Sequence, residues 1–246
     1  MLTRHTLYLL AAALLIVLLC LAGCGGKERP HTLLLLDFDE TSSFVAPGYW
    51  EQSIRMARIA VDHLGPGDAV AVIGIDDHGF DSDDIRLPIT VFSRGTLQAV
   101  ADRNALKARL STLQARPTSS GFRLPNGKMR GIPCGTDLLG AIDQTASLAA
   151  YYPQMRTRVL LLSDMQDDPG SSPSGYSGEK VLFSGDSKAM ALFVDESGGA
   201  EWKARVTRWN STLNGMGLAC HPTDFLAPGA STPSAMALVF QRWLHE

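Results

Sequence analysis

The sequence predicts an α/β domain of the doubly wound type, with a mostly parallel central sheet flanked by helices. Three continuous apolar runs have the length of a strand, which is typical of strands buried on both faces: His31–Phe38, Ala69–Ile75 and Arg158–Ser163. Between the first two runs, Tyr49–Leu64 carries apolar residues at helical spacing. Strands that alternate with helices in this way favour a parallel sheet covered on both faces.

The rest of the chain continues the alternation. After the acidic stretch Asp76–Asp84, the alternating pattern of Leu87–Phe92 predicts a half-exposed edge strand. We place Val100 on the buried face of the next helix, and we expect a long loop at Pro117–Gly135. The other predicted elements are helices at Leu97–Leu113, Leu138–Tyr151, Ala200–Leu213 and Pro233–Leu244, and strands near Ala189–Val194 and Gly217–Cys220.

The first residues have the pattern of a secretory signal. Arg4 precedes the apolar run Leu7–Leu21, and small residues follow it. Leu21–Cys24 resembles the lipobox of bacterial lipoproteins, in which the cysteine is diacylated and becomes the new first residue. The alternative is an uncleaved membrane anchor, because the run approaches the length that spans a bilayer.

This resemblance implies a signal peptide at 1–23 and a short polar tether at 24–30 that starts from a lipidated Cys24, and the remaining residues 31–246 are expected to form one domain. The domain is then expected in the cell envelope, tethered to a membrane on its extracytoplasmic face. Gly25 stands where an aspartate would resemble an inner-membrane retention signal, so the outer membrane is expected in a cell with two membranes.

The composition excludes several classes of function. The formal net charge of -3 lacks the basic excess of nucleic-acid-binding proteins. None of the six histidines has zinc-ligand spacing with a cysteine or glutamate. The four cysteines do not form a closely spaced disulfide framework, and whether Cys134 and Cys220 are bridged stays open.

Polar residues follow the buried runs at three places. In a doubly wound sheet, ligands bind beyond the carboxyl ends of the strands, where the strand order reverses. The three places are the Asp-x-Thr-x-Ser pattern Asp39–Ser43, the Gly-Thr-x-Leu-x-x-Ala pattern Gly135–Ala141, and Ser163–Asp164.

These three pieces, in this order, resemble the metal-ion-dependent adhesion site of von Willebrand factor A (vWA) domains, whose usual first motif is Asp-x-Ser-x-Ser. Thr41 replaces the first serine and keeps the hydroxyl, whereas Ser42 replaces the usual glycine of the turn. The resemblance implies a divalent cation, Mg²⁺ or else Mn²⁺ or Ca²⁺, because hard cations prefer oxygen ligands. The implied ligands are Asp39, Thr41, Ser43, Thr136 and Asp164.

A site with few charged ligands leaves its cation able to take an acidic group from a protein partner. The resemblance therefore implies a protein-binding module rather than an enzyme. A first alternative is a phosphatase, because Asp37-Phe38-Asp39-Glu40-Thr41 also resembles the first motif of haloacid dehalogenase-type phosphatases, with Asp37 as nucleophile and Asp39 as acid and base. A second alternative is a vWA-like scaffold without metal, in which Ser42 or Ser43 caps the following helix.

Overall fold

The structure is a computed structural model, and the chain divides into two compact units, Met1–Pro30 and His31–Glu246. It describes residues 29–45, 48–75, 85–113, 122–123, 129–130, 137–166, 181–194, 199–227 and 232–246, without the side chains of residues 42, 43, 122, 123, 129 and 130. Of the first unit only Arg29 and Pro30 are described, so the predicted signal peptide and Cys24 lie outside the described residues. Within the described part of the chain, no helix is long and apolar enough to cross a membrane.

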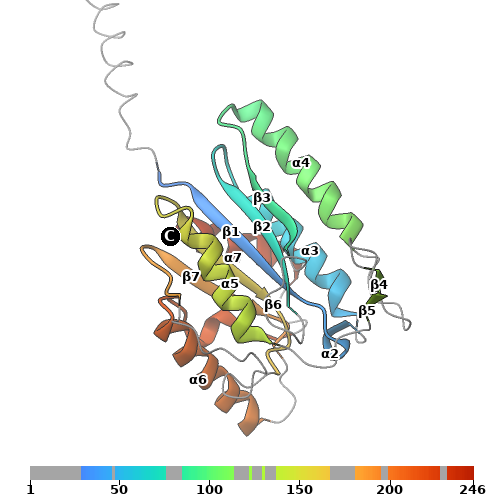
Figure 1. Ribbon diagram of the computed structural model, residues 1–246, viewed down its shortest axis with the longest axis vertical. Coiled ribbons are helices and arrows are strands. Elements are labelled where there is room, and N and C mark those ends of the chain that lie inside the picture. The colour runs from blue at the N-terminus through green and yellow to red at the C-terminus, as the bar shows by residue number, and fades with distance from the viewer. Residues whose placement is uncertain are drawn as a thin grey trace, which may run out of the picture. The chain divides into compact units, whose positions relative to one another are not determined.

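A six-stranded sheet in the order β3-β2-β1-β6-β7-β8 forms the centre of the His31–Glu246 unit (Figure 1). Every neighbouring pair is parallel except β2 and β3, which run antiparallel with two register shifts. This confirms the predicted fold class. The strands are β1 (Thr32–Asp39), β2 (Ala69–Ile75), β3 (Ile85–Val91), β6 (Arg156–Leu162), β7 (Ser187–Leu192) and β8 (Phe225–Leu226).

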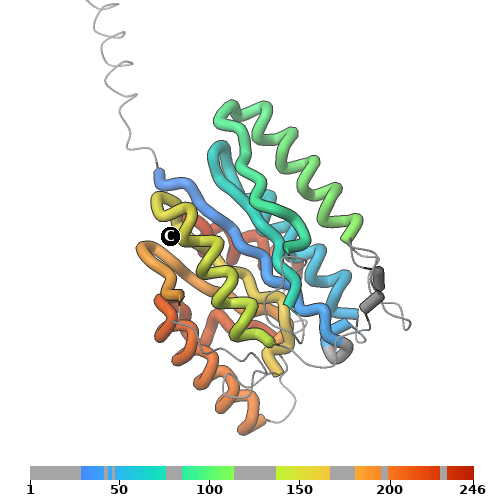
Figure 2. Tube along the Cα trace, in the orientation of Figure 1, coloured from blue at the N-terminus to red at the C-terminus, as the bar shows by residue number. Residues whose placement is uncertain are grey.

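Helices cover both faces of the sheet (Figures 1 and 2). The leucines of β1 alternate between two cores, since successive side chains of a strand point to opposite faces. Leu34 and Leu36 pack with α2, α3, α4 and α7, and Leu33 and Leu35 pack with α5 and α6. The helices are α2 (Ser42–Val45), α3 (Tyr49–Asp62), α4 (Thr96–Thr112), α5 (Leu138–Ala150), α6 (Ala200–Gly215) and α7 (Pro233–His245).

Three expectations from the sequence need correction. Gly217–Cys220 contributes only a bridge between Ala219 and Lys188, and the last strand is instead β8, after a 3-10 turn at Pro222–Asp224. Val100 is 39% exposed, because Ala99 faces the core one position earlier on α4. The long loop Pro117–Gly135 contains a small hairpin of β4 (Phe122–Arg123) and β5 (Met129–Arg130).

The strand order reverses between β1 and β6. β1 leads through α3 to β2 on one side, whereas β6 leads through β7 to β8 on the other. Chain connections therefore leave the carboxyl ends of these two neighbours in opposite directions, and the gap between them is where open α/β sheets bind ligands. Phe38 of β1 pairs with Leu162 of β6, so the residues just after this pair share the rim.

Candidate metal centre at the carboxyl edge

Two carboxylates meet at this rim. Asp39 is the last residue of β1, and Asp164 follows β6 by two residues. Both are removed from solvent, with exposed fractions of 0% for Asp39 and 2% for Asp164. The structure thus brings together two of the predicted ligands that lie 125 residues apart in sequence.

Hydroxyl groups hold Asp39 in place. Its Oδ1 accepts hydrogen bonds from the backbone N–H of Thr41 at 2.9 Å and from the Thr41 hydroxyl at 2.6 Å. Its Oδ2 accepts from the Ser163 hydroxyl at 2.7 Å, and that hydroxyl in turn accepts from the N–H of Met165. The carboxylate is therefore oriented by both strands that border the rim.

The electrostatics of the rim disfavour two negative charges. Burial and, after it, the charge of Asp164 raise the pKa of Asp39 to about 7, against the hydrogen bonds from Thr41 and Ser163 that lower it. Asp164 has one oxygen fixed by the N–H of Gln166 at 3.0 Å. Two like charges in low dielectric repel strongly, and a positive charge between them relieves that repulsion.

The structure describes the three predicted hydroxyl ligands to different extents. Thr41 is 1% exposed, and its carbonyl accepts from the N–H groups of Phe44 and Val45, so it opens the short helix α2. Ser43 lies in α2, and its side chain is outside the described part. Thr136 also lies outside the described residues.

Asp137 is a polar residue of this region to which the sequence reasoning gave no role. It caps α5, where its Oδ1 accepts from the N–H of Gly140 at 3.0 Å. Its Oδ2 is buried and has no hydrogen-bond partner in the described structure. Eight residues further along α5, Thr145 bonds to Asp37 of β1, so α5 runs along β1 with its N-terminus toward the carboxyl edge. A sequence signal was present, because an aspartate just before a helix is a typical cap.

A buried ion pair braces the loop next to Asp39. The Nε of Arg86 on β3 donates to Glu40 Oε1 at 2.7 Å, and its second nitrogen donates to the other carboxylate oxygen. The side chains are only 2% and 6% exposed. Gly74 makes room for the pair, because a Cβ at this position would lie 2.8 Å from Arg86 Nε and 3.1 Å from Glu40 Oε1.

Asp37, the nucleophile of the phosphatase alternative, lies beneath α5. It is fully buried, its Oδ2 accepts from the Thr145 hydroxyl at 3.0 Å, and its Oδ1 has no described partner. Burial raises its pKa to about 8, although the Thr145 hydrogen bond lowers it. A carboxyl acts as a nucleophile when it is ionised, and burial disfavours the ionised form of Asp37.

The side-chain atoms at this rim are of the type that a hard cation prefers as ligands. Asp39, Asp164 and Thr41 supply carboxylate and hydroxyl oxygens, the atoms that Mg²⁺ prefers. Among the described residues, no group of three or more His, Cys, Asp or Glu side chains is arranged to hold a metal ion. A cation at this rim therefore needs the predicted hydroxyl ligands in addition to the two carboxylates.

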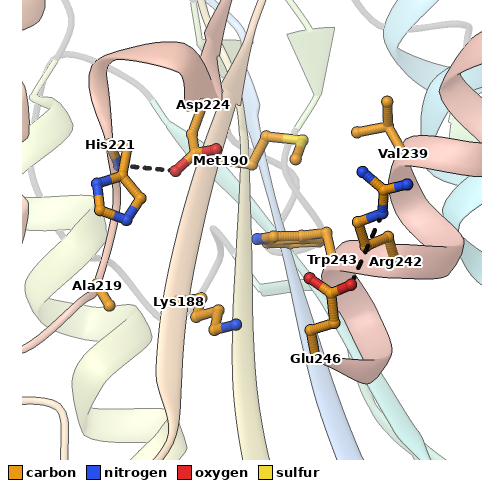
Figure 3. A pocket seen from close by; sticks show the side chains of 9 residues that line it. All are labelled: Lys188, Met190, Ala219, His221, Asp224, Val239, Arg242, Trp243 and Glu246. Atoms are coloured by element: carbon orange, nitrogen blue, oxygen red, sulfur yellow. Dashed lines mark hydrogen bonds and ion pairs between the residues drawn. The ribbon is translucent and has the colours of Figure 1, made fainter.

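A cavity of about 340 Å³ lies elsewhere in the fold, between β7, the 3-10 turn and α7 (Figure 3). It shares no residue with the predicted metal ligands, and it is lined by Lys188, Met190, Ala219, His221, Asp224, Val239, Arg242, Trp243 and Glu246. Close to it, Cys220 is a free, buried thiol. Cys134, the other cysteine considered for a bridge with Cys220, lies outside the described residues.

Comparison with known proteins gives matches among solved structures only. No protein-family model matches the chain, and no curated protein matches it. The chain is similar to a von Willebrand factor type A protein from Catenulispora acidiphila, at 12% identity and a TM-score of 0.46, over 87% of this chain and 42% of that one. It is also similar to the pilus adhesin SpaC from Lactobacillus rhamnosus GG in its open conformation, at 11% identity and a TM-score of 0.47, over 88% of this chain and 30% of that one.

A further similarity is to proximal thread matrix protein 1 from the mussel byssus, at 12% identity and a TM-score of 0.47, over 88% of this chain and 48% of that one. The chain spans less than half the length of each of these proteins.

Proposed function

We propose that this chain is a membrane-tethered module that captures a protein partner through a divalent cation bound at the carboxyl edge of the sheet. The observation that carries the proposal is the convergence of Asp39 and Asp164, two buried carboxylates, at the point where the strand order reverses. Asp39, Thr41, Ser43, Thr136 and Asp164 are the proposed ligands.

When bound, the cation offers an electrophilic coordination position to an acidic group of the partner. The chain's own residues keep the number of charged ligands small, since only Asp39 and Asp164 carry charge. Hydroxyl groups complete the set and also fix the Asp39 carboxylate, as the Thr41 and Ser163 hydrogen bonds do. Mg²⁺ tolerates this composition because it retains several water ligands. The arrangement supports binding and assigns no step of bond cleavage to the chain.

Thermal unfolding of the purified full chain, with and without millimolar MgCl₂ or MnCl₂, tests the metal site. A cation that binds only the folded state stabilises that state and so raises the melting temperature. The stabilisation is about 2.7 kcal/mol when the concentration of the cation is a hundred times its dissociation constant. We expect Asp39→Asn and Asp164→Asn to abolish this rise, and Asp37→Asn, the matched control on the same strand, to retain it.

Asp39→Asn has a second expected effect that separates a metal site from a purely structural role. The amide can still accept from Thr41 and can donate to the Ser163 hydroxyl, while the repulsion with Asp164 disappears. The metal-free variant is therefore expected to melt at the same temperature as the unchanged protein or above it. No response of the unchanged protein to either cation would leave the metal-free scaffold as the better reading, and phosphomonoester hydrolysis lost in Asp37→Asn would establish the phosphatase.

The membrane tether is a separate part of the proposal and has its own measurement. Cys24 is the proposed lipid attachment site, which places the domain in the cell envelope on the extracytoplasmic side. Mass spectrometry of the mature N-terminus is expected to find a diacylated Cys24, and Cys24→Ser is expected to prevent this modification. A mature chain that starts elsewhere, or an unmodified cysteine, contradicts the tether.

A further inference from the structure

The end of the His31–Glu246 unit at which β1 starts carries most of the exposed large apolar side chains of the described structure. We call this end the entry pole. Its exposed apolar residues are Val91, Leu97, Val100, Tyr151 and Leu182, and the remaining exposed large apolar residue of the described structure, Leu238, lies on α7.

The register of the sheet places one part of this set at the pole. Val91, at the end of β3, pairs with Ala69 of β2, which in turn pairs with Leu33, the second residue of β1. Leu97 is the second residue of α4, which starts soon after β3 ends, and it is 88% exposed. In Figure 1 the start of α4 lies at the same end of the sheet as the blue start of β1.

The other part of the set lies across the start of β1. Tyr151 caps the C-terminal end of α5 and is 79% exposed. The strand β6 follows it and begins at Arg156, which pairs with Thr32. Leu182 lines a small hollow together with residues that follow α5. Exposed apolar residues therefore lie on both sides of the start of β1.

A shallow apolar groove lies between β3 and the end of α5. It is lined by Ala71, Ile85, Pro88, Ile89, Leu148, Tyr151 and Tyr152, so it runs from β3 to the end of α5. Soluble proteins rarely expose contiguous apolar surface without a partner for it.

Charged side chains of this pole pair with one another. Asp186, just before β7, accepts from Arg158 at 3.0 Å and lies 3.3 Å from Arg156. Arg242 and Glu246 form an exposed pair at the end of α7. The basic side chains Arg156 and Arg158 of this pole are therefore paired with Asp186, whereas the exposed Arg94 lies three residues before Leu97.

The chain itself indicates what covers the pole. Seven Cα–Cα steps separate Cys24 from His31, and a fully extended chain of this length spans about 25 Å. β1 then runs for eight residues, about 26 Å, so Asp39 at its far end lies that much further along the chain from the lipid than Thr32 does. A lipid at Cys24 therefore keeps a bilayer within reach of the entry pole.

We propose that the entry pole rests on the surface of a lipid bilayer, with Leu97 and Tyr151 inserted at the boundary between headgroups and acyl chains. This inference rests on the lipid tether of the proposed function. Amphipathic surfaces bind bilayers in this manner by burying apolar side chains at the interface. The carboxyl edge with Asp39 and Asp164 then faces away from the membrane, toward a partner.

Fluorescence quenching in reconstituted vesicles tests the contact. Leu97→Trp and Leu238→Trp each add one exposed indole, at positions that are 88% and 70% exposed. Leu238 lies on α7, five residues before Trp243, whose carbonyl accepts from Arg158 near the pole. The full-length lipidated variants are placed in phosphatidylcholine vesicles with brominated acyl chains, and the unchanged protein gives the background of the native tryptophans.

The bromines are expected to quench most of the fluorescence added at position 97 and little of that added at position 238. Equal quenching at both positions, or none at 97, overturns the proposal. Quenching at 97 that needs anionic lipid and disappears in high salt shows adsorption by charge and also overturns it. Weak quenching at 97 that increases when the protein is diluted into more vesicles shows that a second copy covers the pole at higher density, which overturns it too.

The N-terminal mass of the same samples separates this inference from the tether. A diacylated chain without quenching at 97 refutes the contact and leaves the tether standing. Quenching at 97 in a chain without lipid refutes the tether and leaves the contact standing. Leu97→Asp with Tyr151→Asp is expected to lower the protection of backbone amides of the pole from hydrogen exchange in vesicles, with no change at the carboxyl edge.

Discussion

Replacing Arg86 by methionine is expected to destabilise the protein far more than removing an ordinary surface cation. Arg86 and Glu40 form a bidentate pair in which the side chains are 2% and 6% exposed. Methionine keeps much of the side-chain volume and removes the charge, so the buried Glu40 carboxylate loses both hydrogen bonds from Arg86. Breaking a buried pair by removal of one partner costs about 3–5 kcal/mol.

Lys107→Met is the matched control. Lys107 pairs with Asp62 at 2.5 Å, but the side chains are 21% and 51% exposed, so water replaces the lost partner. Exposed pairs contribute about 0–1 kcal/mol. Urea unfolding of the full chain, followed by circular dichroism, compares the two variants with the unchanged protein. A loss below about 1 kcal/mol in Arg86→Met, equal to that of the control, would refute the argument from burial.

Three further predictions concern other parts of the fold. Gly74→Ala is expected to lower the free energy of unfolding by about 1–3 kcal/mol, because the added Cβ displaces Arg86, and thermal melting measures this. Burial raises the pKa of Asp186, but the hydrogen bond and charge of Arg158 lower it more, so the net pKa lies below the ordinary 3.8. The resulting stabilisation is present at neutral pH and is lost as the pH falls below about 4 through the lowered pKa; Asp186→Asn is expected to flatten this part of a melting-temperature profile, and an unchanged profile contradicts it. Burial raises the pKa of the Cys220 thiol to about 12, so peptide mass spectrometry after brief iodoacetamide treatment should find Cys220 alkylated only when urea is present.

The sequence was most informative where burial dictates residue type. The leucines of β1 and the apolar run of β6 are visible as strands because both faces of these strands are covered. β8 has only two residues, too few for a pattern, and the turn-rich stretch before it carries no strand signal. Val100 was placed wrongly because helical spacing alone does not fix the phase of the buried face when Ala99 is small enough to pack there.

The site could be predicted in part for a similar reason. Asp39 and Asp164 each follow a buried run, and parallel neighbours deliver such residues to one rim. The Glu40–Arg86 pair could not be predicted, because its members are 46 residues apart and meet only through the register of β2 and β3. The metal-ligand roles of all five residues, Asp39, Thr41, Ser43, Thr136 and Asp164, stay predictions.

The two edges of the sheet have a consequence for crowded conditions. An unpaired strand edge can recruit the edge of another molecule, and a protein held on a membrane meets copies of itself at high local density. β8 offers only two residues for such pairing, and β3 carries Pro88 and two register irregularities. Proline lacks the N–H that a neighbouring strand would need, and an irregular strand does not match a straight partner. The fold can therefore be packed densely on a surface with little tendency to join sheet to sheet.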